Sequence, residues 1–377
     1  MKKSIYKINY NILIPIVLLS IISIISIYSA SIYTSSDLGN LALKQGIWYI
    51  IGWILVYGIY KLGNEYIYDK TWILYVIGNI LLFLLLIFGT EINGSKCWFV
   101  IPGIGSIQPS EFMKIFIMLQ LSSMIHKFRL KYRKPTLTNE FVFILKTLLI
   151  VLIPSILTFI QPDTGSVIIY FVIYISMLFI SGIRFRWFLI GGGLLFILIG
   201  GILLLYFNSE DTFVSIFGNS MFYRLQRVFN WNDGGGMQYT NSIVSIGTAG
   251  LFGHGIKGTP MYFPEAPTDF IFSIYASSFG LVGVIILLVI IIYLDVQIII
   301  LARKRKKDTD KYILAGILGM LLIQQVQNIG MTIGLFPITG ITLPFVSYGG
   351  SSLLSYMLLV GMLINISNER NTKYNYN

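Results

Sequence analysis

Apolar stretches alternate with polar segments along the whole chain. An α-helix needs roughly 20 apolar residues to cross about 30 Å of hydrocarbon, and ten stretches approach or exceed that length. They lie at residues 11–33, 45–63, 72–89, 109–126, 143–160, 165–182, 187–207, 271–302, 312–335 and 348–367. The pattern predicts an all-α integral membrane protein, a ten-helix transmembrane bundle in one domain spanning residues 1–377.

Two of the polar segments are long enough to carry structure of their own. Residues 90–108 are rich in Gly and Pro, and residues 208–270 separate the seventh and eighth stretches. Loops this long are usually functional or disordered. Residues 241–251 are apolar but too short to span, which fits a re-entrant or membrane-surface helix. We expect residues 208–270 to be a folded outer loop that packs over the mouth of the bundle, and the long eighth helix to project beyond one face.

Composition and charge support this interpretation and orient it. Only 11% of residues are charged, against about 25% in soluble domains. With the N-terminus inside, 21 of the 27 Lys and Arg residues fall on the inner side, and the positive-inside rule then makes both termini cytoplasmic. The six outer cations are Lys44, Lys96, Lys114, Arg224, Arg227 and Lys257. The basic runs 127–134 and 303–307 indicate topology and contact with anionic lipids, and no nucleic-acid partner is expected.

Asp269 is the strongest candidate for chemistry. It follows Pro264 and Pro267 at the end of the long outer loop, where the eighth apolar stretch begins. Burial there would raise its pKa and make it a better general base; a helix N-cap is the alternative role. The only cysteine, Cys97, excludes an intrachain disulfide. The two histidines lie on opposite sides of the membrane, which argues against a paired-histidine metal site or a Ser-His-Asp triad.

Further polar residues gather at the outer ends of the apolar stretches. Glu111 and Lys114 are three residues apart and share a face of the fourth helix. They predict either an ion pair that helps helices pack or the polar wall of a cavity open to the outside. Asp163 is expected to cap the sixth helix. Residues 334–340 and 347–352 fit helix packing and ligand contact equally well. The outer cations could attract an anionic headgroup such as a diphosphate.

Several strings, in order, resemble one family. They are residues 94–98 (GSKCW), 108–114 (QPSEFMK), 161–165 (QPDTG), Met237-Gln238 with Ser242, 246–253 (IGTAGLFG), 264–272 (PEAPTDFIF), 337–340 (PITG) and 347–352 (SYGGSS). Together they resemble the SEDS family (shape, elongation, division and sporulation) of RodA, FtsW and SpoVE, and the last loop looks more like RodA than FtsW.

The resemblance implies a peptidoglycan glycosyltransferase that polymerises lipid II on the outer face of the bacterial cytoplasmic membrane. Asp269 matches the essential aspartate, which by analogy deprotonates the 4-hydroxyl of the acceptor GlcNAc so that it attacks C1 of the donor MurNAc with inversion. Undecaprenyl diphosphate leaves. The resemblance names no certain cofactor, a divalent cation (Mg²⁺ or Mn²⁺) being the candidate, and no protein metal ligand. A class B penicillin-binding protein is the expected protein partner. The substrate-binding candidates are Trp98, Lys96, Gln108, Ser110, Glu111, Lys114, Lys44, Gln238 and Ser347.

The chain also departs from the family pattern. Cys97 stands where Arg is usual, Pro267 where His is frequent, residues 258–264 are shorter than usual, and Ser277-Ser278 replace a glutamate pair. A catalytically weak or inactive paralogue that scaffolds a penicillin-binding protein is therefore an alternative. A lipid II flippase is less favoured, because neither inverted repeats nor helices broken at mid-membrane are evident in the sequence. Whether the role is in cell shape, division or sporulation stays open.

Overall fold

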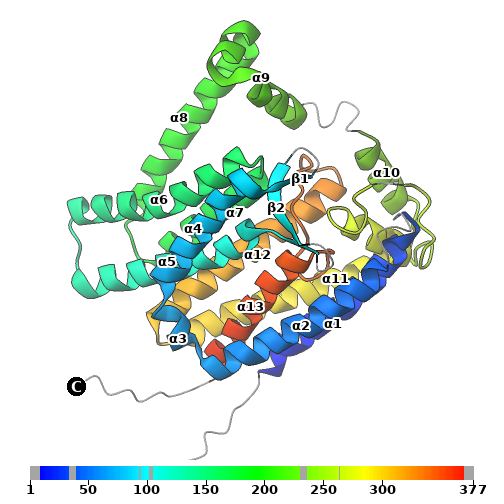
Figure 1. Cartoon of the computed structure of the whole chain (residues 1–377), viewed down its shortest axis with the longest axis horizontal. Helices are drawn as coiled ribbons and strands as arrows, with labels where there is room; N and C mark the ends of the chain where they lie inside the picture. Colours follow the sequence, from blue (N-terminus) through cyan, green and yellow to red (C-terminus); the bar gives the residue numbers. More distant parts are fainter. Residues whose placement is uncertain are drawn as a thin grey trace, which may run out of the picture.

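Ten helices of the computed structural model follow the ten apolar stretches (Figure 1). The structure describes residues 9–33, 40–92, 95–101, 105–229, 236–262 and 264–368. The ten helices are α1 (Tyr10–Ala30), α2 (Leu41–Leu62), α4 (Thr71–Phe88), α5 (Pro109–Lys131), α6 (Leu137–Ile160), α7 (Thr164–Ile180), α8 (Arg186–Asn208), α11 (Ile271–Lys304), α12 (Asp308–Thr332) and α13 (Gly350–Ser367).

Within the described residues, eight of these helices are both long and apolar enough to cross a membrane. The other two are α5, which carries several charged residues, and α7, which has 17 residues. The chain is therefore a mostly helical, multi-pass membrane protein. α1 begins and α13 ends at the same side of the bundle (Figure 1).

Side-chain caps fix several helix starts. Asn40 accepts a hydrogen bond from the backbone N–H of Leu43, so α2 begins four residues earlier than the apolar pattern predicts. The Asp163 carboxylate accepts the N–H of Ser166 at 3.0 Å, which confirms the expected cap of α7. Pro109 occupies the first turn of α5, where the missing N–H costs nothing.

The segment 90–107 forms a small antiparallel sheet, which the sequence interpretation treated only as a loop. Its strands are β1 (Thr90–Ile92), β2 (Ser95–Ile101) and β3 (Gly105–Ile107), in the order β1-β2-β3. In the second pairing, Phe99 lies opposite Ile107 and Ile101 opposite Gly105. Short additional helices are η1 (Ser31–Tyr33) and α3 (Asn64–Tyr68).

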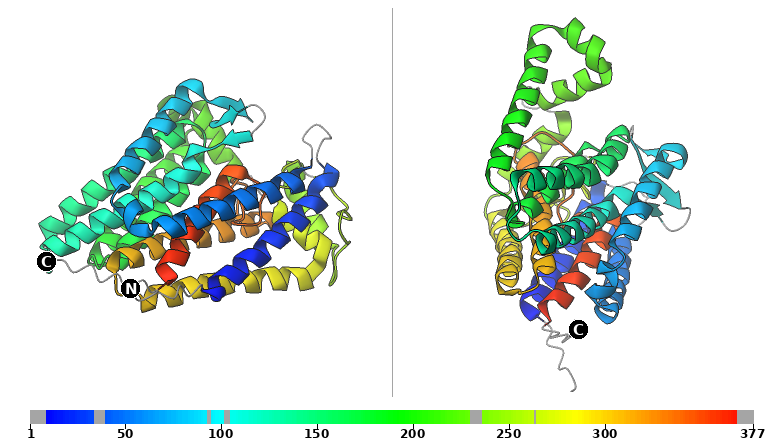
Figure 2. Two further views of the ribbon diagram at one scale, coloured as in Figure 1. Left: turned by 60° about the horizontal axis from the view of Figure 1, so that its bottom comes forward. Right: turned by 90° about the vertical axis from the view of Figure 1, so that its left-hand side faces the viewer.

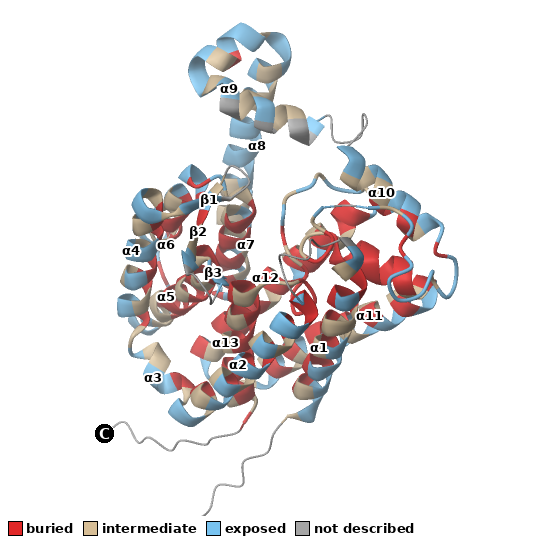
Figure 3. Cartoon of the chain, turned by 45° about the vertical axis from the view of Figure 1, so that its right-hand side comes forward, coloured by how far each residue is buried: buried red, intermediate tan, exposed pale blue. Residues whose placement is uncertain are grey.

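Buried residues concentrate in α5, α12 and α13, which form the centre of the bundle (Figure 3). By contrast, α8 has no buried residue. It continues into α9 (Glu210–Phe229), and the two form an arm that projects from the bundle (Figure 2). The aromatic rings of α9 stack on the end of α8, for example Phe229 on Tyr206 at 5.5 Å between centroids.

The outer loop therefore packs over the bundle only in part. α9 stands with α8 away from the mouth, because its rings find partners on α8, and this corrects the expectation for the first half of the loop. α10 (Gly236–Gly247) contacts α11 and α12. Residues 241–247 of the apolar run are therefore helical, whereas residues 248–251 lie in turns after the helix.

The eighth helix has 34 residues, as long as its apolar stretch indicated, but it is broken, which the sequence interpretation did not predict. Gly280 interrupts α11 with φ 62° and ψ −161°. Residues 250–255 lie against the break and satisfy its free backbone groups. The N–H groups of His254 and Gly255 donate to the carbonyls of Ser277 and Ser278, and those of residues 281 and 282 donate to the carbonyls of residues 250 and 251. We call residues 250–255 the bracing loop.

Candidate active site

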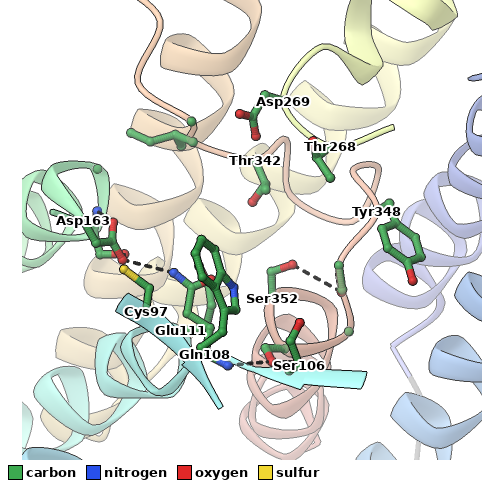
Figure 4. A pocket seen from close by; sticks show the side chains of 18 of the residues that line it. Cys97, Ser106, Gln108, Glu111, Asp163, Thr268, Asp269, Thr342, Tyr348 and Ser352 are labelled. Atoms are coloured by element: carbon green, nitrogen blue, oxygen red, sulfur yellow. Dashed lines mark hydrogen bonds between the residues drawn. The ribbon is translucent and has the colours of Figure 1, made fainter. Parts of the chain in front are cut away.

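A cavity of about 1300 Å³ opens among the helix ends that the sequence marked as polar (Figure 4). It exceeds the roughly 300–1,000 Å³ typical of small-ligand pockets, so it suits a large substrate. Its walls come from α2, β2, β3, α5, α7, α12, the segment before α11, the loop before α13 and the first residues of α13. Sequence-predicted site residues in the lining are Lys44, Trp98, Gln108, Glu111, Lys114 and Asp269.

Asp269 lies where the long outer segment meets α11, and its carboxylate points into the cavity (Figure 4). One carboxylate oxygen approaches Gly340, where an added Cβ would lie 3.5 Å from it. Burial raises the pKa of Asp269 to about 7, and the negative charge of Glu265 adds to the increase. The N-cap alternative is wrong, because the cap position of α11 is Phe270 and it makes no side-chain cap hydrogen bond.

The backbone around Asp269 is held by two elements, α12 and the loop before α13. The Asn328 amide of α12 donates to the carbonyls of Asp269 at 2.9 Å and Ile341 at 2.8 Å. Ser347 donates its hydroxyl to the Thr268 carbonyl at 2.6 Å, and the N–H of Tyr348 donates to the carbonyl of residue 267 at 2.8 Å. Ser347, a predicted substrate contact, is therefore placed behind the lining, where it fixes the backbone beside Asp269.

Asp163 organises the wall formed by α5 and α7. Its carboxylate accepts hydrogen bonds from Gln108 at 3.1 Å, Ser110 at 3.0 Å and the hydroxyl of Ser166 at 2.7 Å. Gln108 and Asp163 line the cavity, whereas Ser110 is buried behind them and does not. The cap therefore has a second function, since it also fixes a polar face of the cavity.

Glu111 and Lys114 satisfy both interpretations of their spacing. The ammonium of Lys114 donates to the Glu111 carboxylate at 2.7 Å, and both side chains are almost fully buried. Ser355 of α13 approaches the other carboxylate oxygen at 3.4 Å. Both residues also line the cavity. The pair is thus a helix-packing contact and a polar wall at once.

Strand β2 brings Cys97 and Trp98 to the cavity. The Cys97 thiol donates to the Gln161 carbonyl at 2.9 Å, and burial raises its pKa to about 12, so it is an unreactive structural thiol. Lys96 is exposed and lies outside the lining. Gln238 lies on α10, also outside it. The side chains of Arg224 and Arg227, and residue Gly94, fall outside the described part of the chain.

The sequence interpretation missed several cavity residues. Trp48 lines the cavity and packs against Gly350. The contact is so close that a Cβ added at Gly350 would lie 2.7 Å from the Trp48 ring. Gln324 of α12 also lines it; its amide nitrogen donates to Tyr356 at 2.8 Å, while its buried amide oxygen has no hydrogen-bond partner among the described residues. The sequence could have indicated Gln324, because four amide side chains between residues 324 and 328 interrupt the apolar part of α12.

Ser277 and Ser278, which replace the expected glutamates, lie outside the lining. Both are buried, and the Ser278 hydroxyl lies 2.8 Å from that of Ser29 on α1. Their carbonyls accept the hydrogen bonds of the bracing loop. In this chain the two serines therefore help to stabilise the break in α11. No group of three or more His, Cys, Asp or Glu side chains that could hold a metal ion occurs among the described residues.

Comparison with known proteins agrees with this architecture. The chain is 30% identical to the probable peptidoglycan glycosyltransferase FtsW of Lactococcus lactis over 95% of this chain and 92% of that one. It is 34% identical to the stage V sporulation protein E of Bacillus subtilis, over 93% and 94% of the two chains.

Solved structures share the fold. One, from a study of polymerization and crosslinking by a peptidoglycan synthase complex, has a TM-score of 0.77 at 24% identity, covering 95% of this chain and 97% of that one. The rod shape determining protein RodA of Thermus thermophilus has a TM-score of 0.68 at 24% identity, covering 95% and 96%. The profile of the family described as cell cycle protein, FtsW/RodA/SpoVE, matches residues 10–372. The chain belongs to this family.

Proposed function

We propose that this protein is a peptidoglycan glycosyltransferase that polymerises lipid II, with Asp269 as its general base. One observation carries the proposal: a buried carboxylate, with its pKa raised to about 7, points into a cavity of about 1300 Å³. A base with a pKa near the working pH is best suited to take a proton in the transition state. The names of the FtsW relatives give the same activity.

The proposed reaction uses residues of the cavity wall. Asp269 takes the proton of the acceptor's 4-hydroxyl, whose oxygen forms the new bond to C1 of the donor sugar. The bond from C1 to the diphosphate breaks, and undecaprenyl diphosphate leaves with the electron pair. Lys44, which lines the cavity, is the proposed cation for the developing charge on the diphosphate. Trp98 and Gln108 offer a flat face and an amide for the sugars.

A divalent cation remains part of the proposal. Mg²⁺ is usually held by one or two carboxylates together with substrate phosphates. Glu265 lines the cavity and would hold such an ion together with the diphosphate, which leaves Asp269 free to act as the base. The ion would supply charge neutralisation at the leaving group.

The proposal includes an orientation and a partner. We place α5 and α7 across the membrane with the eight longer apolar helices, which gives ten spans. The uneven distribution of Lys and Arg puts both termini in the cytoplasm and the cavity on the outer side. The related synthase complex, described as coordinating polymerization and crosslinking, supports a class B penicillin-binding protein as partner.

Polymerisation of labelled lipid II by the purified protein tests this function, with and without a divalent cation and the partner. Glycan is expected from the parent and from Asp211→Ala, a control that removes an exposed outer carboxylate. None is expected from Asp269→Ala or Asp269→Asn. If the parent makes no glycan even with its partner and a cation, the scaffold interpretation replaces this one. If Asp269→Asn polymerises like the parent, Asp269 is not the base.

A further inference from the structure

A second hollow lies between α1 and α2, and the reaction proposed above does not use it. It measures about 770 Å³ and is lined almost wholly by hydrocarbon. Its walls include Ile24, Tyr28, Gly46, Ile50, Trp53 and, from the segment after the bracing loop, Ile256. We call it the α1–α2 groove. Because its lining is apolar, its natural content is a hydrocarbon chain and not water.

The groove and the cavity share a wall. Leu43 and Ile47 line both of them. These residues are four apart on α2, so they lie on one face of the helix, one above the other. A single molecule can therefore place a polar headgroup in the cavity and lead an apolar chain across this face into the groove.

The length of the groove matches one leaflet. Its α2 lining runs from Asn40, the cap residue of the helix, to Trp53. At 1.5 Å per residue this is roughly 20 Å, against about 15 Å for half of the hydrocarbon core. The groove therefore begins at the helix end beside the cavity mouth and is long enough to reach the middle of the membrane.

Two cations lie near the end of the groove that is beside the cavity mouth. Lys44 lies between the groove residues Leu43 and Gly46 in sequence and lines the cavity. The ammonium of Lys257 lies 4.1 Å from the centroid of the Tyr28 ring, which is itself part of the groove wall. An apolar channel with positive charge at its head fits a lipid whose headgroup is an anion.

We propose that the α1–α2 groove binds the isoprenoid chain of a polyprenyl-diphosphate-linked sugar whose diphosphate lies in the cavity near Lys44. This proposal rests on the proposed function and assigns the place of the substrate's lipid part. Recognition of the chain would hold the reacting sugar at Asp269, since head and tail are bound on either side of the Leu43–Ile47 wall. An acyl chain of an ordinary phospholipid is the competing occupant.

Two glycines of α2 provide a matched pair of variants. A Cβ added at Gly46 meets no atom within 4 Å, so Gly46→Leu is chosen to place a side chain in the groove without a clash at its Cβ. Gly58 is equally open but lines neither hollow. Both substitutions replace a glycine within α2 by a better helix former, so a difference between them reports the groove.

Kinetics with lipid II of natural tail length and with a short-tailed analogue test the assignment. Gly46→Leu is expected to raise KM for the long-tailed substrate roughly tenfold, the loss that corresponds to about two methylene groups that no longer fit. KM for the short-tailed analogue, and both KM values of Gly58→Leu, should stay at the parent value. Equal KM values for Gly46→Leu and the parent, or an equal increase with both substrates, would overturn the proposal.

Photo-crosslinking separates this proposal from the proposed function. Undecaprenyl diphosphate with a photoreactive tail is expected to label residues 24–53, and unlabelled undecaprenyl diphosphate should compete where excess phosphatidylglycerol does not. Competition by both lipids alike would show a general lipid groove and overturn the assignment. Specific labelling of a protein that makes no glycan would keep the groove and reject the polymerase. Polymerisation without labelling of α1 or α2 would keep the polymerase and reject the groove as the binding site of the chain.

Discussion

At the scale of single residues, the site depends on what surrounds one carboxylate. Asp269 has a raised pKa because it is buried beside Glu265, and its position is set by Asn328 and Ser347, which hold its backbone. The sequence predicted Asp269 as the candidate base from its place at a helix start. It could not predict Asn328 or Gln324, because an amide in an apolar helix acquires a role only when helix packing brings it to a partner.

The raised pKa predicts a pH dependence. The general base acts in its ionised form, so the polymerisation rate should rise with pH, with a midpoint near the Asp269 pKa of about 7. Glu265→Gln removes the neighbouring negative charge that contributes to the increase, so its midpoint should move to lower pH. Initial rates between about pH 5.5 and about pH 8.5 measure both profiles. A flat profile, or an upward shift in Glu265→Gln, would contradict this account of Asp269.

Asn328 is expected to act as a positioning residue. Asn328→Ala removes both hydrogen bonds to the backbone carbonyls of Asp269 and Ile341, so kcat should fall about tenfold or more while KM changes little. The midpoint of its pH profile should also shift, because the surroundings of the carboxylate change. Gln327→Ala is the control, since Gln327 donates to the carbonyl of Pro337 in the same outer loop without touching Asp269. An equal kcat in Asn328→Ala and Gln327→Ala would exclude a positioning role for Asn328.

At the scale of elements, hydrophobic length and caps explain most of the fold. Each of the ten apolar stretches corresponds to one helix. α5 is longer than its stretch, because the first residues of the basic run after residue 126 are also helical, up to Lys131. The small sheet was missed because strands as short as Gly105–Ile107 leave little pattern. The break in α11 was missed for another reason: the positive φ of Gly280 depends on the bracing loop, which is distant in sequence.

Gly280 and the bracing loop predict a stability effect. A Cβ at Gly280 would lie 2.5 Å from the nitrogen of Gly253, and the backbone there has φ 62°. Gly280→Ala should therefore lower the free energy of unfolding by about 2 kcal/mol. Gly200→Ala in α8, where a Cβ meets nothing within 4 Å, is the control and should not destabilise. Thermal unfolding of the purified protein measures both, and equal unfolding temperatures would show that the close approach has no energetic weight.

At the scale of the whole molecule, the bundle has an enclosed centre and an open margin. The cavity is built on the buried helices α5, α12 and α13, while α8 and α9 form an arm at the edge. Composition predicted the membrane location, whereas the packing of α9 on α8 depends on aromatic contacts that have no counterpart in hydropathy.

The single cysteine makes the orientation directly testable. In a Cys97→Ser background, Thr212→Cys on α9 and Lys306→Cys between α11 and α12 each introduce one exposed thiol. A membrane-impermeant maleimide should label Thr212→Cys in intact cells and Lys306→Cys only after permeabilisation, because the positive-inside rule places residue 306 in the cytoplasm. The opposite pattern would reverse the topology and place the cavity on the cytoplasmic side.

The bracing loop also bears on how the chain is made. A helix broken inside a bilayer exposes backbone groups that lipid cannot satisfy, yet the break at Gly280 is covered by residues 250–255. These residues precede α11, so the ribosome delivers them first, and a chain emerging at roughly 5–20 residues per second brings Gly280 out seconds later. The order of the sequence therefore makes the cover available before the break enters the membrane, so the backbone groups at the break need no segment that has yet to be translated.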